Sequence, residues 1–210
     1  MGSTMSRRIK RQLRDRGTEQ GFSLIEVLFS IVIILTGLLA MLATFAYALS
    51  TTQSVQEDQV AKQTAQDTLE NIFTARDTQQ ITFNQIANVS AGGIFTDGPT
   101  NLLDTGPDGL AGTPDDIAYN PATTGCPAAI NPLGVQCIKL PGKDGILGTP
   151  DDTYMVLGNF QRTIVIANTF NPDGSINTNL KQITVNVQYT RPLQNRPRIY
   201  TVNALMSVYR

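Results

Sequence analysis

Two similar nine-residue segments, each with three aspartates, have residue types and spacing that suit ligand binding. Residues 108–116 read Asp-Gly-Leu-Ala-Gly-Thr-Pro-Asp-Asp, and residues 144–152 read Asp-Gly-Ile-Leu-Gly-Thr-Pro-Asp-Asp. Several carboxylates within nine residues, with glycines that let backbone carbonyls turn inward, suit the hard cation Ca²⁺. The spacing is not that of an EF-hand, and Asp-Gly and Thr-Pro-Asp-Asp are also turn sequences, so two similar surface turns are the alternative. The candidate calcium ligands are Asp108, Asp115, Asp116, Asp144, Asp151 and Asp152.

A single carboxylate, Glu26, interrupts a long apolar run. Residues 22–49 are apolar or small almost throughout, and Glu26 is their only charged residue. Residues 1–21 carry six basic and two acidic residues. Because a helix of roughly 20 apolar residues spans a bilayer and basic flanks stay cytoplasmic, the pattern predicts one membrane-spanning helix. It also predicts a cytoplasmic N-terminus and a chain outside the membrane after about Ser50.

Glu26 itself is a candidate functional residue. An unpartnered carboxylate in the membrane costs on the order of 2.5–3.5 kcal/mol, so a charged residue in such a segment indicates a function by default. The alternative is that Glu26 lies in the headgroup zone and has no role.

The residues around Glu26 carry a resemblance to a known family. Gly-Phe-Ser-Leu-Ile-Glu-Val at residues 21–27, after a short basic leader, resembles the cleavage and methylation signal of type IV prepilins and the related pseudopilins. The resemblance covers about 30 residues. It implies that a prepilin peptidase in the membrane cuts between Gly21 and Phe22 and N-methylates Phe22. It further implies that Glu26 pairs with the amine of Phe22 on a neighbouring subunit, where an unpaired charge would be costly.

Composition restricts the other classes of function. After Gly21 there remain ten basic and fifteen acidic residues, a net charge of −5, which argues against nucleic acid as the main partner. The chain has no His, the commonest general base and metal ligand. Neither Gly-x-Ser-x-Gly, nor His-Glu-x-x-His, nor a phosphate-binding glycine loop occurs. We therefore expect a protein that is not an enzyme but is the substrate of one.

Cys126 and Cys137 are the only cysteines, and both lie in the part predicted to be outside. In an oxidising compartment a disulfide is the simplest expectation, and two free thiols are the alternative. The short closed loop would stabilise the fold by about 2–3 kcal/mol. In the prepilin family that the sequence resembles, the disulfide often closes a C-terminal loop. Here the two cysteines lie in the middle of the chain, which departs from that pattern.

The rest of the chain predicts an α+β domain. The helix from Phe22 is expected to continue to about Ala75, with Gly37 as its expected weak point. Its second half, residues 50–78, is amphipathic. Residues 79–158 hold 8 of the 11 prolines and 12 of the 17 glycines, which predicts a loop-rich insert with short strands at most. The apolar positions expected to cover a sheet are Val55, Ala61, Ala65, Leu69, Ile72 and Phe73.

Residues 159–210 have the pattern of an antiparallel sheet. A β-branched run at 162–167, alternation at 183–189 and a last alternating segment at 200–208 predict three strands. Asn-Pro-Asp-Gly at 171–174 predicts a turn, and residues 191–197, with two prolines, predict a break. The order of long helix, variable loops and C-terminal sheet also resembles the pilin fold. The strands are most similar to those of PilV-type minor pilins or I-type minor pseudopilins of type II secretion.

The predicted function is that of a structural subunit of a type IV pilus or a type II secretion-type filament. The resemblance implies a single-pass inner-membrane protein that joins a periplasmic or extracellular filament. Its partners would be other pilin or pseudopilin subunits, the prepilin peptidase, the inner-membrane assembly platform and the membrane. The alternative is a secreted or membrane-anchored interaction module, with calcium as a candidate ligand. In that case the apolar run is a signal peptide cut after Ala46-Tyr47-Ala48, or an anchor.

Overall fold

The computed structural model describes residues 23–120, 126–191 and 194–209, with the side chains of residues 191, 194 and 195 left out. The chain divides into two compact units, residues 1–51 and 52–210. The expected cleavage site between Gly21 and Phe22 lies outside the described residues.

The helix α1 spans Leu24–Asp77 and runs through Gly37 without interruption. Neither Pro nor any glycine besides Gly37 occurs within it, so nothing in its sequence breaks the hydrogen-bond ladder. Within residues 23–51 every side chain is exposed, including the apolar ones. The helix is long and apolar enough, by length and composition, to cross a membrane.

The second unit contains a four-stranded antiparallel sheet in the order β1-β4-β5-β6. The strands are β1 (Thr100–Asn101), β4 (Phe160–Phe170), β5 (Ile176–Arg191) and β6 (Gln194–Ser207). The turn predicted at 171–174 joins β4 to β5, with Gly174 N–H donating to the Asn171 carbonyl over 2.9 Å at a φ of 82°. The break predicted at 191–197 is shorter than expected. Pro197 lies inside β6 opposite Thr190, and β6 is an edge strand, where proline is tolerated.

The insert between helix and sheet has little regular structure. It forms the 3₁₀ turn η1 (Val89–Ala91) and a two-stranded antiparallel hairpin of β2 (Cys137–Leu140) and β3 (Thr153–Val156). A disulfide joins Cys126 to Cys137 at the start of β2, with the two Cα atoms 6.3 Å apart, so the expected pairing is confirmed.

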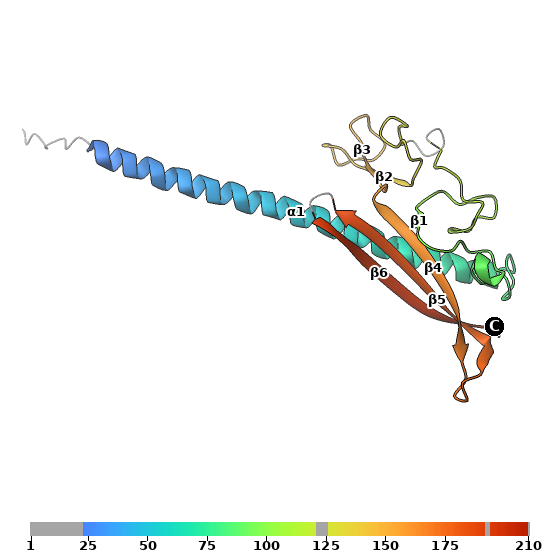
Figure 1. The fold of residues 1–210 in the computed structure, drawn as a ribbon. Coiled ribbons are helices and arrows are strands. Elements are labelled where there is room, and N and C mark those ends of the chain that lie inside the picture. Colours follow the sequence, from blue (N-terminus) through green and yellow to red (C-terminus); the bar gives the residue numbers. More distant parts are fainter. Residues whose placement is uncertain (1–22, 121–125, 192–193, 210) are drawn as a thin grey trace, which may run out of the picture. The chain divides into compact units, whose positions relative to one another are not determined.

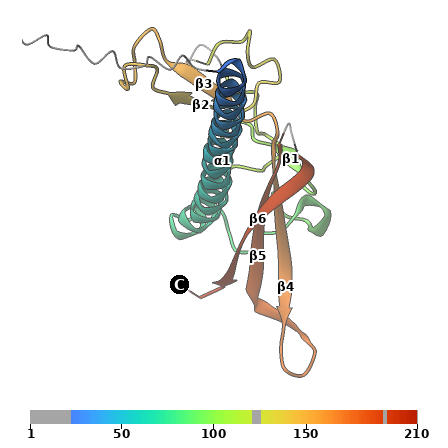
Figure 2. The same cartoon turned by 90° about the vertical axis from the view of Figure 1, so that its left-hand side faces the viewer.

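The core of the second unit lies between α1 and the sheet. Ala61, Ala65, Ile72 and Ala75 of α1 are buried against the inward residues of β4 and β5 in one apolar cluster. Figures 1 and 2 show the later part of α1 beside strands β4 to β6. The predicted α+β arrangement, a long helix with a C-terminal antiparallel sheet, is confirmed. Val55 was expected to cover the sheet, but its side chain is exposed because it precedes the first buried turn of the helix.

Candidate functional site

The N-terminal site is built on the first turns of α1. Glu26 lies in the first turn, and its backbone N–H donates to the Ser23 carbonyl over 2.9 Å. One turn later, the Ser30 hydroxyl donates to the Glu26 backbone carbonyl over 2.8 Å. The Glu26 side chain is exposed, and so are the apolar side chains around it on the helix. An apolar helix surface with one carboxylate is suited to pairing with a cation from another chain.

The six aspartates proposed as calcium ligands form two separate loops. We call residues 106–116 the first loop and residues 142–152 the second loop. In each loop the opening glycine approaches the first Asp of the closing pair so closely that a Cβ would lie 2.2 Å from that Asp's carbonyl oxygen. Glycine is therefore required at Gly106 and Gly142.

The two loops share the same internal hydrogen bonds. In the first loop, the Asp108 carboxylate accepts from Leu110 N–H (2.8 Å) and the Asp116 carboxylate from Gly112 N–H (2.8 Å). In the second loop, the same bonds join Ile146 N–H to Asp144 (2.9 Å) and Gly148 N–H to Asp152 (2.7 Å). The threonine hydroxyl of each loop donates over 2.7 Å to the first Asp of the closing pair, Asp115 or Asp151, and lowers the pKa of that carboxyl.

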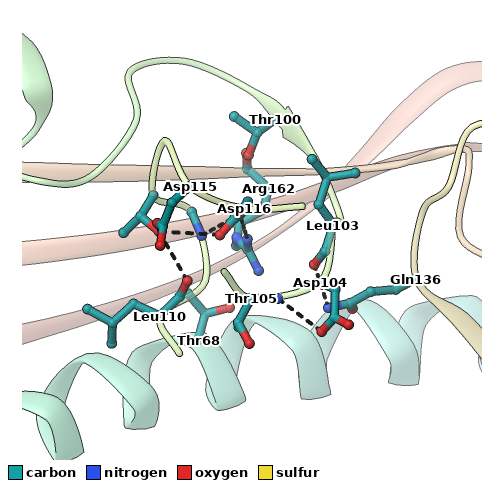
Figure 3. Close-up of polar contacts among 12 residues, drawn as sticks. Thr68, Thr100, Leu103, Asp104, Thr105, Leu110, Asp115, Asp116, Gln136 and Arg162 are labelled. Carbon is teal, nitrogen blue, oxygen red and sulfur yellow. Dashed lines mark hydrogen bonds and ion pairs between the residues drawn. The ribbon is translucent and has the colours of Figure 1, made fainter. Parts of the chain in front are cut away.

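The cations beside the loops differ. The Arg162 Nη2 atom lies 3.3 Å from the Asp116 carboxylate, and the two side chains are 2 % and 7 % exposed (Figure 3). Lys139 Nζ lies 2.8 Å from the Asp152 carboxylate, and the two side chains are 40 % and 2 % exposed, so only the cation differs in exposure between the two pairs. Burial raises the pKa of Asp116 even though the Gly112 N–H and Arg162 act to lower it. The pKa of Asp152 is lowered, chiefly by its hydrogen bond from Lys139.

The oxygen atoms of the first loop gather around one hydroxyl. The Thr113 Oγ1 atom lies 2.7 Å from Asp115, 3.3 Å from Asp116 and 3.5 Å from Asp108 carboxylate oxygens. The Leu110 carbonyl lies 3.2 Å from the same atom. Across the part of the chain that the structure describes, however, no three His, Cys, Asp or Glu side chains adopt an arrangement that could hold a metal ion. As it stands, each loop is a turn closed by its own hydrogen bonds.

The basic side chains that pair with the loops, Arg162 and Lys139, were not predicted from the sequence. Arg162 lies 46 residues after Asp116, and Lys139 precedes Asp152, so no common spacing links them to the repeats. A signal existed for Arg162: in β4 it shares the inward face with the buried Phe160 and Ile164. An arginine at an inward strand position predicts a buried partner of opposite charge.

Comparison with protein families matches residues 16–42 to the family described as the prokaryotic N-terminal methylation motif. Comparison with curated proteins and with solved structures found no match. The matched range contains the predicted cleavage site between Gly21 and Phe22, and also Glu26 and the first turns of α1. The chain therefore carries an N-terminal methylation signal of the type IV prepilin and pseudopilin kind.

Proposed function

We propose that this protein is a minor pilin or pseudopilin, a structural subunit of a type IV pilus or of a type II secretion-type filament. The observation that supports the proposal is the N-terminal methylation signal, which leads directly into α1. The apolar side chains of residues 23–51, the described part of the first unit, are all exposed, so they need a cover. Lipid supplies that cover before assembly, and the helices of neighbouring subunits supply it in a filament.

The proposed sequence of events follows from the signal. The chain is inserted in the inner membrane with a cytoplasmic N-terminus, and prepilin peptidase cuts between Gly21 and Phe22 and methylates Phe22. The assembly platform then transfers the subunit into a periplasmic or extracellular filament. There Glu26 pairs with the amine of Phe22 in a neighbour, because an ion pair inside an apolar bundle needs both partners.

The N-terminus and intact mass of the protein recovered from cells test the processing step. We expect a chain that starts at N-methylated Phe22. A chain that starts at Leu49 would identify an ordinary secreted domain and would reject the proposal. An unprocessed chain would identify a plain membrane anchor and would reject it as well.

The variant Glu26→Gln tests the assembly step. We expect normal processing and a loss of the protein from sheared or purified filaments, because the neighbouring amine is left without a counter-charge. Glu70→Gln is the matched control, since Glu70 is an exposed carboxylate further along α1. Equal incorporation of both variants would contradict the role of Glu26.

A second proposed property is calcium binding by the two aspartate loops. Its support is the set of carboxylate and carbonyl oxygens around Thr113 in the first loop, which would have to close further around a cation after the hydroxyl turned aside, since in the described structure they form no metal-binding group. We expect calcium to raise the melting temperature of the soluble domain from Ser50 onward and chelator to lower it. The double variant Asp108→Ala with Asp144→Ala should remove that difference. No response to chelator in the unaltered domain would identify both loops as plain turns.

A further inference from the structure

The two aspartate loops have the same local structure but opposite surroundings. Leu110 in the first loop is 1 % exposed and belongs to the core of the second unit. The corresponding residue of the second loop, Ile146, is 61 % exposed, and its neighbour Leu147 is 60 % exposed. Because the hydrogen bonds within the loops match, the difference comes from what covers each loop.

The first loop shows what kind of surface covers such a loop. The Asn71 side chain of α1 donates to the Gly109 carbonyl over 3.3 Å, and the Gln80 side chain donates to the Asp108 carbonyl. Leu110 joins the same apolar cluster as Ile72 of α1. The first loop is therefore covered on one side by a helix that contributes an apolar side chain to the same cluster, with carboxamide donors on it and just beyond its end, while Arg162 and Ile164 of β4 meet the loop from the sheet.

The second loop has no such cover in the described part of the chain. No described side chain donates to the carbonyls of Asp144 or Gly145, which correspond to those of Asp108 and Gly109. The loop is nevertheless fully formed, with Lys139 paired to Asp152. It presents two adjacent apolar side chains and two free carbonyls in the arrangement that the first loop uses for docking.

We propose that the second loop docks on the helix of a neighbouring filament subunit, at a face with carboxamide side chains beside an apolar one. This proposal rests on the proposed function. The helix of this chain has such a face just after its apolar half, where Val55, Gln56 and Gln59 are exposed at helical spacing. The contact would be head-to-tail, between different surfaces of two subunits, and contacts of this kind generate open helical filaments.

The small size of the contact favours a filament neighbour over a free partner. Two side chains and two carbonyls bury far less surface than the roughly 800 Å² per partner that a stable stand-alone interface buries. The contact therefore needs a neighbour that other contacts already hold in place, as the N-terminal helices do in a filament.

A photo-crosslinking amino acid at Leu147 in the full chain, activated in isolated filaments, tests the proposal. We expect a cross-link to the helical segment just after the apolar half of a subunit, residues 52–63 in this chain. The same reagent at Ile199, which is 60 % exposed on β6, is the matched control and should not reach that segment. Cross-links from Leu147 to any other surface, or none at all, would overturn the docking.

A third position separates this result from a failure of the proposed function. The reagent at Leu35, in the apolar half of α1, should join subunits in any filament built through these helices. Cross-links from Leu35 but not from Leu147 would reject the docking and leave the filament role intact. No cross-links from Leu35 would reject the filament role, and the docking with it.

Variants give an independent measure. Replacing Ile146 and Leu147 together by Ser should lower incorporation into filaments about tenfold, the change expected from losing one well-buried apolar contact. The melting temperature of the isolated subunit should not fall, because both side chains are exposed within it. Ile199→Ser is the control for a general effect of removing an exposed apolar residue. Unchanged incorporation of the double variant would contradict the docking.

Discussion

Replacing Arg162 by Met tests the buried ion pair that holds the first loop to the sheet. Methionine keeps most of the apolar stem of arginine and removes the guanidinium, so the change isolates the charge. The Asp116 carboxylate, 7 % exposed, would lose a cation 3.3 Å away and keep only hydrogen bonds within its loop. Breaking a buried pair from one side costs about 3–5 kcal/mol. With a urea m-value of about 2 kcal/mol/M, the unfolding midpoint should fall by about 1.5–2.5 M.

The cost of Arg162→Met should also depend on pH. Burial already raises the pKa of Asp116, and Arg162 is one of the groups that lowers it, so the variant should raise this pKa further. A carboxyl with a raised pKa in the folded state takes up its proton before the unfolded chain does. Stability of the variant should therefore recover as pH falls through that raised pKa, until the unfolded value of about 3.9 is reached.

The second loop supplies the control for this experiment. Lys139→Met removes the corresponding cation from Asp152, whose side chain is 2 % exposed, but the side chain that is lost is itself 40 % exposed. Water can therefore approach the position that Lys139 leaves, and we expect a smaller change in the midpoint than for Arg162→Met. Urea unfolding of residues 52–210, followed by circular dichroism at neutral and acidic pH, gives both comparisons. The reasoning would be refuted if Arg162→Met cost no more than Lys139→Met, or if its cost grew on acidification.

Three further predictions concern other parts of the second unit. Gly112→Ala should destabilise the domain by about 1–3 kcal/mol more than Gly148→Ala in urea unfolding, because both have positive φ but only Gly112 has a buried methyl 2.5 Å from its Cβ position. Cys137→Ser should lower the unfolding free energy by about 2–3 kcal/mol, and reductant should have no further effect on the variant. Arg76→Met should remove donors to three carbonyls at residues 207–209, and hydrogen exchange should show faster exchange there with the sheet otherwise protected.

The sequence predicted the regular elements well because their signals are local. The apolar run and the absence of breakers gave α1, and alternation gave β5 and the second half of β6. The predicted break between the last two strands, residues 191–197, was too wide. Pro197 predicted a break there, but it lies within β6 because proline is tolerated in an edge strand. Val55 was assigned to the core by helical spacing, but spacing does not say where along a helix burial begins.

The surroundings of the loops were not predictable, because the two loops are nearly identical in sequence. Leu110 and Ile146 occupy the same position in the same turn, yet one is in the core and the other in solvent. The groups that contact the first loop come from distant parts of the sequence: Asn71, Gln80 and Arg162. Lys139 of β2 contacts the second loop. Only the tertiary fold brings these groups to the loops, and no local pattern encodes it.

The difference between buried Arg162 and partly exposed Lys139 also predicts which loop would bind calcium more tightly. A cation that takes the carboxylates of the first loop must compete with Arg162, which is buried and would lose its partner at high cost. In the second loop it must displace Lys139, which is partly exposed and can move into water. If the loops bind calcium, the second should therefore bind more tightly, and Asp144→Ala should weaken binding more than Asp108→Ala in a calcium titration by calorimetry. Equal effects would show that the neighbouring cations do not control the loops, and a larger effect of Asp108→Ala would contradict the electrostatic argument.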